Sequence, residues 1–432
     1  MDTHHHHNHN EDMLQVEEAL ELILANFGKL PSEVKPILDT LGQTLDESIT
    51  ATFDIPPLEN SAMDGYALRY EDISHTTPDH PTTLEVIGEV AAGHISNKEV
   101  RPGSAIRIMT GAPIPDGADT VIPFEDTDEI DRKNSGKKIN QIGIRIISQR
   151  RANIRPAGED VKKDEVILTK GTILRPTEIG VLASMGKSEV KVIRKPHVSI
   201  LATGDELLQP GSPIEPGKIF DSNSFSLAAS VTKYGGIPHP LGIAPDNLEA
   251  TVEKLNQGLD ADLLITSAGV SKGDYDFIKD VLVQHGEIKF WSVRMRPAKP
   301  LAFGTIKDPK GRMVPHIGLP GNPVSALVAF EQFCRPAILR MLGRTELTKP
   351  TVTAILRGKI INYDGRRVYA RVVVGKTGEN YYAIPTGPQG SNILTSISRA
   401  NGLAICPQDV PEINDGQIVI VQMLDWPEEV EV

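Results

Sequence analysis

The chain has 432 residues, with 45 Lys or Arg against 57 Asp or Glu, so its net charge is −12 at neutral pH. This length exceeds what one ordinary core supports, and we expect two to four domains. The acidic balance argues against a nucleic-acid partner, which clustered cations would hold. It still permits an anionic ligand in a local basic pocket.

The two cysteines, Cys334 and Cys406, lie far apart in apolar segments. They predict neither a disulfide framework nor a thiolate metal site, and they favour a reducing cytoplasm. No apolar run of about 18 residues predicts a membrane span, and the first residues lack the apolar core of a secretory signal. The histidines from His4 to His9 could bind a metal, but a disordered tail over residues 1–10 is the preferred interpretation.

The N-terminal third predicts one helix and then a β-rich module. From Glu11 to Phe27 apolar residues recur at helical spacing, and Gly28 and Pro31 end the segment. Between about Thr82 and Asp131, runs such as LEVIGEV and AIRIM alternate with Pro/Gly turns, as in an inserted β-rich lobe. The polar KNSGKK stretch at 133–138 predicts a mobile hairpin or loop. Short strand and turn signals over 158–195 lead to a domain boundary near Lys195.

Residues 197–342 alternate between strand and helix patterns. The strand candidates are VSILAT and LLITS, and the helix candidates are NSFSLAASVTKY, DNLEATVEKLNQG and DFIKDVLVQHG. This alternation predicts a doubly wound, mostly parallel α/β domain. Ligands of such sheets bind beyond the carboxyl ends of the strands.

A last strand of this region leads into Gly318-Leu-Pro-Gly-Asn322, and Pro323 then occupies the favoured first position of a helix that Pro336 should kink. From about Lys349 the runs TVTAILRGKII, VYARVVV, YYAIPT and IVIVQML predict a small antiparallel β-barrel or sandwich.

The turn Thr203-Gly204-Asp205-Glu206 directly follows a strand pattern. Its carboxylates could hold Mg²⁺ against phosphate oxygens. Asp205 could equally be a helix cap.

The loop from Ser267 to Asp274 joins a strand to a helix, so its backbone N–H groups predict an anion cradle. It matches neither the nucleotide P-loop nor G-x-G-x-x-G, which disfavours NTPases and dehydrogenases. Asp274 and Asp276 could serve a metal or cap the following helix.

The segment Arg294-Met-Arg296-Pro-Ala-Lys299-Pro300 places three cations on a path that its prolines keep extended. Composition alone would favour a solvated surface, but the position before PLAFG favours an oxyanion or phosphate pocket. Asp246 and Glu249 match a helix capping box, and that structural role is the stronger one. Asp64 before a glycine is usually part of a turn. No H-E-x-x-H or G-x-S-x-G motif supports zinc hydrolysis or serine acyl transfer.

Nine motifs in order resemble the molybdopterin molybdenumtransferases, the family of MoeA and the gephyrin E domain, over about residues 12–425. They are PPLENSAMDGYA, IMTGAPIPDGADTVIPFED, RPAGED, ILATGDEL, DSN, SAGVSKGDYD, RPAKPLAFG, GLPGNPVSA and TGPQGS.

The resemblance implies a disordered tail at 1–10 and four folded parts. These are an elongated N-terminal dimerisation domain at 11–56 plus 149–195, an inserted β-rich lobe at 57–148, a molybdopterin-binding α/β domain at 196–345 and a β-barrel at 346–432. It also implies a cytoplasmic homodimer in which the SAMDGYA and MTGAPIP loops complete the partner's α/β site.

The implied reaction takes adenylylated molybdopterin and molybdate, uses Mg²⁺, and yields molybdenum cofactor and AMP. The protein would mainly supply positioning and electrostatics. Asp160 falls on a family functional position. The implied catalytic positions are Asp64, Thr110, Glu206, Asp246 and Asp276, of which Glu206, Asp246 and Asp276 would also hold Mg²⁺. The implied substrate-binding positions are Thr203, Gly204, Asp205, Ser267, Gly269, Ser271, Gly273, Asp274, Arg296, Lys299, Pro320, Gly321, Asn322, Pro323, Arg366, Arg371 and Ser391.

The chain departs from the family at two positions, since Arg296 stands where lysine is commonest and Ser292 aligns near a second lysine. Guanidinium binds oxyanions bidentately and ammonium acts as a point charge, so these departures bear on the pocket's charge. Arg366, Arg371 and Ser391 resemble barrel residues on the molybdate side. The choice between molybdate and tungstate stays open.

Two alternatives to insertion are a molybdopterin adenylyltransferase, which shares the SAGVSKGD and GLPGNP loops, and a gephyrin-like scaffold. Free-standing adenylyltransferases lack SAMDGYA and MTGAPIP, and no fused second enzyme domain or long linker is present here. Insertion is therefore the leading hypothesis, with an adenylyltransferase as an expected protein partner.

Overall fold

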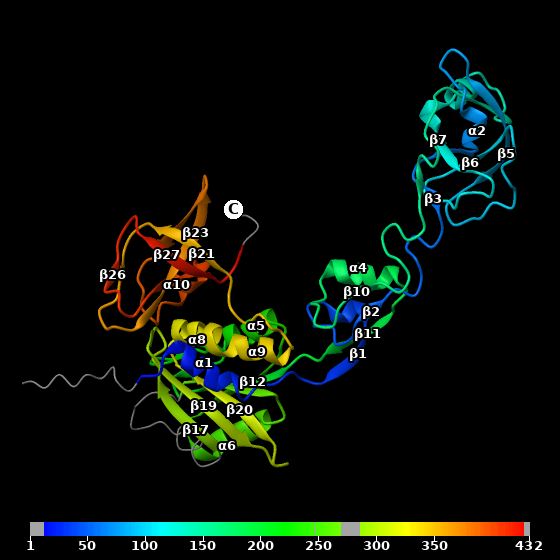
Figure 1. Cartoon of the computed structure of the whole chain (residues 1–432). Helices are drawn as coiled ribbons and strands as arrows, with labels where there is room; N and C mark the ends of the chain where they lie inside the picture. The colour runs from blue at the N-terminus through cyan, green and yellow to red at the C-terminus, as the bar shows by residue number, and fades with distance from the viewer. Residues whose placement is uncertain (1–12, 246, 269–285, 427–432) are drawn as a thin grey trace, which may run out of the picture. The chain divides into compact units, whose positions relative to one another are not determined.

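The computed structural model describes residues 13–245, 247–268 and 286–426, and the chain forms two compact units. Unit 1 is Met1–Asp46, Ile173–Arg175 and Glu189–Val432, and unit 2 is Glu47–Thr172 and Pro176–Ser188. Figure 1 labels the elements of both units. None of the helices in the described ranges has both the length and the apolar character that crossing a bilayer demands.

Unit 2 is built on a five-stranded sheet of order β7-β4-β6-β5-β8 (Figure 1). Alternate residues of β4 enter two apolar clusters, Tyr66 and Leu68 one and Ala67 the other, so both faces of the sheet are covered. Every pairing is antiparallel except β5 with β6. The strands are β4 (Gly65–Leu68), β5 (Thr82–Val90), β6 (Ser104–Ile108), β7 (Thr120–Pro123) and β8 (Gln141–Ile144).

Smaller elements complete unit 2. Strand β2 pairs with β10 and β3 with β9, both antiparallel. The bounds are β2 (Ile49–Thr50), β3 (Asn60–Ser61), α2 (Tyr70–Ile73), η2 (Phe124–Asp126), α3 (Glu129–Asn134), β9 (Ile154–Arg155), β10 (Val166–Leu168) and α4 (Pro176–Ser184).

Two helices of unit 2 differ from the sequence-based expectation. The KNSGKK stretch begins inside α3, because the buried Glu129 accepts a hydrogen bond from Tyr66 and pairs with Arg107 and so anchors the helix. Helix α4 lies within 158–195, where we expected strands and turns. Only Glu178 and Leu182 of α4 are buried, which leaves little apolar periodicity to detect.

The α/β domain of unit 1 has a six-stranded sheet of order β15-β12-β16-β20-β19-β17. The first four strands are mutually parallel, which confirms the doubly wound, mostly parallel fold, and β19 and β17 extend the sheet in antiparallel fashion. The strands are β12 (His197–Thr203), β15 (Ile237–Ala244), β16 (Leu263–Ser267), β17 (Gly286–Ser292), β19 (Pro300–Lys307) and β20 (Met313–Leu319).

Helices cover both faces of this sheet (Figure 1). Val198 and Ile200 of β12 pack in the largest core with α1 (Val16–Leu24), α5 (Asn223–Lys233) and α8 (Pro323–Ala329). Leu201 of the same strand faces the opposite way, into a smaller core with α6 (Leu248–Gly258). Helix α1 is shorter at both ends than the expected span of 11–27. The expected helix DFIKDVLVQHG lies outside the described residues except for its last residue, Gly286, which begins β17.

The segment after β20 is helical with one irregular turn. Helix α8 (Pro323–Ala329) begins at Pro323 as expected, a π turn η3 follows (Phe330–Cys334), and α9 (Arg335–Met341) completes it. Pro336 lacks an amide hydrogen and its ring crowds the preceding turn. The distortion expected at this proline thus takes the form of a wider turn directly before it.

The C-terminal region is a closed five-stranded β-barrel, in which each strand pairs with its neighbours in the ring β23-β24-β21-β27-β25-β23. The pairing of β21 with β24 is parallel, whereas we expected antiparallel strands throughout. The strands are β21 (Thr351–Leu356), β23 (Arg367–Thr377), β24 (Asn380–Pro385), β25 (Gly402–Cys406) and β27 (Ile418–Met423).

Short elements complete unit 1. In particular, β18 (Met295–Arg296) pairs with β23 and so attaches the cationic segment to the barrel. The others are β1 (Ser32–Pro36), η1 (Ile37–Thr40), β11 (Glu189–Ile193), β13 (Leu207–Leu208), β14 (Ile219–Phe220), β22 (Ile360–Ile361), α10 (Leu394–Ser398) and β26 (Glu412–Ile413).

Candidate active site

A cavity of about 570 Å³ opens at the carboxyl ends of the adjacent parallel strands β12, β16 and β20. Thr203 ends β12, Ser267 ends β16 and Pro320 follows β20, so the parallel topology brings the three together. We call this the first cavity. Its wall consists of Thr203, Glu206, Leu207, Ile219, Phe220, Asp221, Ser222, Asn223, Ser267, Ala268, Pro300, Pro320, Gly321, Asn322, Pro323 and Asn392.

Glu206 reaches the first cavity because Gly204 leaves room for its side chain. Gly204 has a φ of +141°, and a Cβ there would lie 2.3 Å from Glu206 Oε2. No helix follows this turn, since Leu207 and Leu208 form β13 and pair with β14. The interpretation of Asp205 as a helix cap is therefore wrong, and the backbone carbonyl of Asp205 instead accepts a hydrogen bond from Lys218.

Asp221 and Asn223 are cavity residues that the sequence-based site omitted. Asp221 is buried; its Oδ1 accepts from the Ser224 amide, and its Oδ2 has no hydrogen-bond partner. Asn223 Nδ2 donates to Ser267 Oγ and to the Gly321 carbonyl, at 2.7 Å each, and thereby ties two strand-end loops together. The motif DSN was the available signal, because it stands directly before a well-formed helix pattern.

A second cavity, of about 360 Å³, lies on the barrel. Arg296, Lys359 and Arg371 contribute cations to its wall, and no described Asp or Glu side chain lines it. Arg371 is 1% exposed, and its guanidinium donates to Ser396 Oγ at 3.1 Å and to the Gly390 carbonyl at 3.0 Å. Burial lowers the pKa of Arg371 to about 10, because no carboxylate offsets its loss of hydration.

Arg296 is held in the second cavity from two sides. Its guanidinium lies 4.0 Å from the ring centroid of Tyr363, and its Nη1 is 3.6 Å from Asp364 Oδ2. That Nη1 is buried and has no hydrogen-bond partner. The chain between the two cavities is short, since Arg296 and Pro297 line the second and Pro300 lines the first.

Five of the expected substrate-binding residues that the structure describes line neither cavity, namely Gly204, Asp205, Lys299, Arg366 and Ser391. Arg366 is neutralised by Asp364, at 3.0 Å from Nε to Oδ2, and also donates to the Met295 carbonyl. Lys299 contributes a backbone carbonyl to the Val293 amide. Ser391 accepts from the Val324 amide at 3.1 Å, while its neighbour Asn392 reaches the first cavity.

Asp64 and Thr110 meet in unit 2. The carboxylate Oδ1 of Asp64 accepts from the Thr110 amide at 2.7 Å and from its hydroxyl at 2.8 Å. The amide hydrogen bond, followed by the hydroxyl one, lowers the pKa of Asp64 and keeps it ionised. The SAMDGYA and MTGAPIP motifs, which are far apart in sequence, are thus in direct contact through this pair.

Six expected site residues lie outside the described residues, namely Asp246, Gly269, Ser271, Gly273, Asp274 and Asp276. Helix α6 is capped by Asn247, whose side chain accepts from the Ala250 amide at 2.8 Å, so the capping box does not begin at Asp246. Within the described part of the chain, no three His, Cys, Asp or Glu side chains lie close enough to hold a metal ion.

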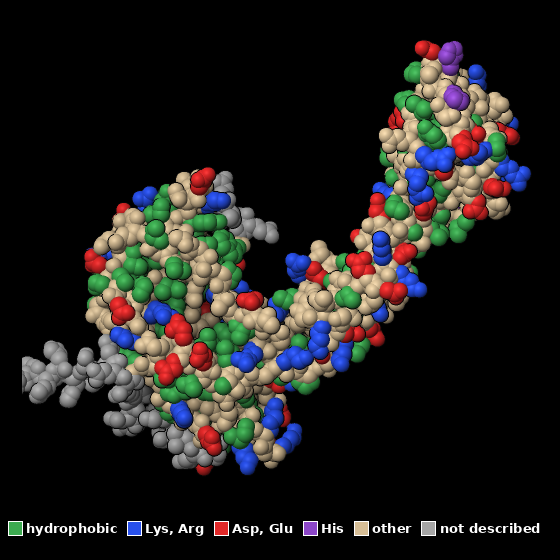
Figure 2. All heavy atoms as spheres, viewed as in Figure 1, with side chains coloured by type: hydrophobic (Ala, Val, Ile, Leu, Met, Phe, Trp, Pro, Cys, Tyr) green, Lys and Arg blue, Asp and Glu red, His purple; other side chains and the backbone are tan. Residues whose placement is uncertain are grey.

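The face drawn in Figure 2 shows Lys and Arg side chains interspersed with Asp and Glu in both units. On this face, the basic side chains of the described residues do not gather into one large surface. Their mixture accords with the acidic net charge.

Comparison with known proteins covers nearly the whole chain. The model for the MoeA N-terminal region (domain I and II) matches residues 14–186, that for a probable molybdopterin binding domain matches 199–340, and that for the MoeA C-terminal region (domain IV) matches 353–424. A molybdopterin molybdenumtransferase 2 of Mycobacterium tuberculosis is 36% identical over 389 residues, which are 88% of this chain and 92% of the relative. The Bacillus subtilis molybdopterin molybdenumtransferase is 33% identical over 427 residues, or 96% of each chain.

Solved structures agree with the sequence relatives. A molybdopterin biosynthesis MoeA protein from Pyrococcus horikoshii superposes with a TM-score of 0.78 at 30% identity and covers 96% of this chain and 100% of its own. A second structure from the same organism gives 0.75 at 32% identity, with 95% and 100% covered. The chain belongs to the MoeA family of molybdopterin molybdenumtransferases.

Proposed function

We propose that this protein inserts molybdenum from molybdate into adenylylated molybdopterin and releases AMP. The observation that carries the proposal is the pair of cavities in unit 1, one carrying carboxylates and one carrying cations, joined by the short segment 296–300. Such a pair suits a reaction that brings a nucleotide-linked pterin and a small oxyanion together. The names of the relatives support the transferase activity.

The first cavity would hold the adenylylated pterin. Its volume of about 570 Å³ falls in the usual range of ligand pockets, and its wall combines apolar side chains such as Phe220 with polar groups at strand ends. The hydrogen bonds of Asn223 hold these strand-end loops together, so the site would bind with little reorganisation.

The described residues of the first cavity fit Mg²⁺ in part. Glu206 and Asp221 are its carboxylates, Asp221 Oδ2 lacks a hydrogen-bond partner, and no described Lys or Arg lines the wall. A phosphoanhydride would be repelled by such a wall, and a hard divalent cation bound to oxygen ligands would offset the repulsion. Glu206 and Asp221 would supply two ligands, with Asp246 and Asp276 as proposed additions.

Molybdate would bind in the second cavity. Arg371 is buried without a carboxylate partner, and Arg296 Nη1 makes no hydrogen bond beside its 3.6 Å ion pair with Asp364, so both can donate to an oxyanion. Arg366 is a weaker candidate because Asp364 already accepts from it. Tungstate has the same charge and shape and would compete for the same donors.

We also propose that the protein is a homodimer. Val34, Leu38 and Leu41 are 64%, 80% and 55% exposed around β1 and η1, and a second subunit would remove this apolar surface from water. The Asp64–Thr110 pair would then serve the partner's first cavity. Leu38→Glu should shift the protein toward a monomer in sedimentation analysis; an unchanged dimer would place the interface elsewhere.

A cytoplasmic location is proposed as well. Cys334 and Cys406 are both buried free thiols, which is the state a reducing compartment maintains. The names of the relatives favour the insertase over the adenylyltransferase and scaffold alternatives.

The decisive experiment measures AMP release from adenylylated molybdopterin with Mg²⁺, with and without molybdate. We expect release that depends on molybdate and yields active cofactor, measured by reconstitution of an apo-molybdoenzyme. Equal AMP release without molybdate would instead indicate a plain hydrolase.

A further inference from the structure

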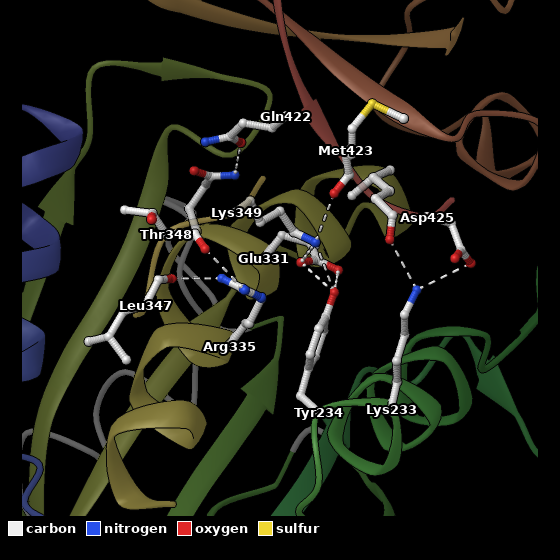
Figure 3. A network of polar contacts seen from close by, with 12 residues as sticks. Lys233, Tyr234, Glu331, Arg335, Leu347, Thr348, Lys349, Gln422, Met423 and Asp425 are labelled. Atoms are coloured by element: carbon white, nitrogen blue, oxygen red, sulfur yellow. Dashed lines mark hydrogen bonds and ion pairs between the residues drawn. The ribbon is translucent and has the colours of Figure 1, made fainter. Parts of the chain in front are cut away.

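A buried polar cluster lies on the side of the α/β domain where it meets the barrel (Figure 3). It consists of Tyr234, Glu331 and Lys349, which contact one another. The Tyr234 hydroxyl donates to Glu331 and lies 2.9 Å from each carboxylate oxygen, and it accepts from Lys349 Nζ at 2.9 Å. Lys349 also pairs with Glu331 at 2.9 Å, and their side chains are only 5% and 12% exposed.

Contacts around this cluster fasten the α/β domain to the barrel. Lys349 stands just before the first barrel strand, and its Nζ also reaches the Met423 carbonyl of β27. Figure 3 shows the bonds that surround it. They run from Lys233 to Leu424 O and Asp425, from Gln332 to Gln422, and from Arg335 to Leu347 O and Thr348 O.

The helices that carry the cluster begin at the first cavity. Helix α5 starts at Asn223 in the cavity wall and ends next to Tyr234, and α8 starts at Pro323 and leads into the π turn that holds Glu331. The barrel returns to the same cavity, where Ser391 accepts from the Val324 amide and Asn392 lines the wall. The barrel is thus held at two places, the cavity edge and the cluster.

Burial of a lysine and a glutamate together gives weak stabilisation, because desolvation opposes their attraction, and apolar side chains of similar size often do as well. Hydrogen-bonded ion pairs are directional and apolar contacts are not, because the strength of a hydrogen bond depends on its angle and distance. A directional contact between two domains therefore limits sliding where an apolar one would permit it.

We infer that Lys349 and Glu331 are positioning residues, which hold the barrel so that its loop 389–392 stays against the start of α8 and the two cavities keep their spacing. Neither residue belongs to the wall of the first or the second cavity. The inference deepens the proposed function and rests on it for its kinetic part. Loss of the contact should weaken the use of molybdate more than the use of the pterin, because the molybdate donors lie mainly on the barrel.

The test compares Lys349→Met with Lys310→Met. Lys310 makes an ion pair with Asp260 in which both side chains are more than 80% exposed, so the control removes the same charge at a surface site. A third variant, Lys349→Met/Glu331→Gln, removes both charges and leaves no buried carboxylate without a partner, should the single variant fold poorly.

For the Lys349→Met variant, or for the double variant, we expect hydrogen–deuterium exchange of the Val324 amide to accelerate at least about tenfold. We expect KM for molybdate to rise by a similar factor while KM for adenylylated molybdopterin and kcat change little. Lys310→Met should match the wild type in both assays.

Unchanged Val324 exchange in a folded Lys349→Met or double variant would overturn the positioning role. So would an equal rise of both KM values, which would indicate general loosening of the domain. If the wild type releases no AMP at all, the proposed function fails, and the exchange measurement still decides whether the cluster positions the barrel.

Discussion

The two cavities of unit 1 differ in how their walls are built and in the sign of the charge that the walls carry. The first is formed by strand ends whose loops are hydrogen-bonded together through Asn223, and its charged wall groups are Glu206 and Asp221. The second is formed by a barrel wall and a short added strand, and its charged groups are Arg296, Lys359 and Arg371. The contrast shows how one fold keeps an acidic cavity and a basic cavity apart while a few residues join them.

The largest expected effect comes from removing a carboxylate of the first cavity. Glu206→Gln keeps the shape over Gly204 but should lower kcat/KM about 100-fold at ordinary Mg²⁺, since a metal contributes several kcal/mol to charge stabilisation. KM for molybdate should stay within about twofold. The measurement is AMP release across a Mg²⁺ titration, and a variant with normal Mg²⁺ dependence would remove Glu206 from the metal site.

Removing a cation from the second cavity should weaken the use of molybdate. Arg371→Gln retains a donor for Ser396 but loses the charge, and we expect KM for molybdate to rise about 30-fold, as for the loss of a charged hydrogen bond. Arg366→Gln is the matched control because Asp364 already neutralises that arginine. If the two variants raise KM equally, the burial of Arg371 is not what distinguishes it.

A smaller effect is a loss of stability in mild acid, which we expect for the α/β domain and not for the barrel. His316 of β20 is fully buried beside Thr266 Oγ1, and burial lowers its pKa to about 3. In the unfolded chain the His316 imidazole has its ordinary pKa of about 6.5. Below that pH the unfolded state therefore binds a proton that the folded state does not. The free energy of unfolding of the α/β domain should fall by about 2 kcal/mol between pH 7.5 and pH 5. Residues 346–432 contain no histidine, so the barrel should not share this loss.

The two tryptophans allow a direct measurement, because Trp291 lies in β17 and Trp426 follows the last barrel strand. Urea unfolding of Trp426→Phe and Trp291→Phe proteins at both pH values would report each domain by fluorescence. His316→Gln, which keeps a polar partner for Thr266, should abolish the acid loss at Trp291. An equal acid loss at both tryptophans would mean that the domains unfold together.

Much of the fold could be predicted because its elements carry strong local patterns. The runs VSILAT, LLITS and NSFSLAASVTKY are apolar or periodic enough to specify strand or helix by themselves. Helix α4 escaped because few of its residues are buried, and α3 because the contacts of Glu129 with Tyr66 and Arg107 decide its ends. Such contacts join residues far apart in sequence, and local patterns do not contain them.

The site was predictable to the extent that motifs stand at strand ends. Thr203, Ser267 and Pro320 meet because parallel strands end on one side, a rule that sequence order already contains. Asp221 was missed because an aspartate at this position in the sequence is typical of an exposed turn, and its burial becomes known only from the folded structure. Arg366 differs from Arg371 because Asp364 pairs with Arg366, whereas Arg371 is buried among uncharged partners, and only the folded chain reveals this.

The π turn between α8 and α9 has a consequence for how this family can vary. A π turn contains one more residue than the α-helical turn it replaces. Deletion of one residue between Phe330 and Cys334 would convert the π turn into an ordinary α-helical turn, and Arg335–Met341 would keep nearly the same orientation relative to Pro323–Ala329. Single-residue gaps in alignments of this segment should therefore fall within 330–334 rather than in the α-helical turns on either side.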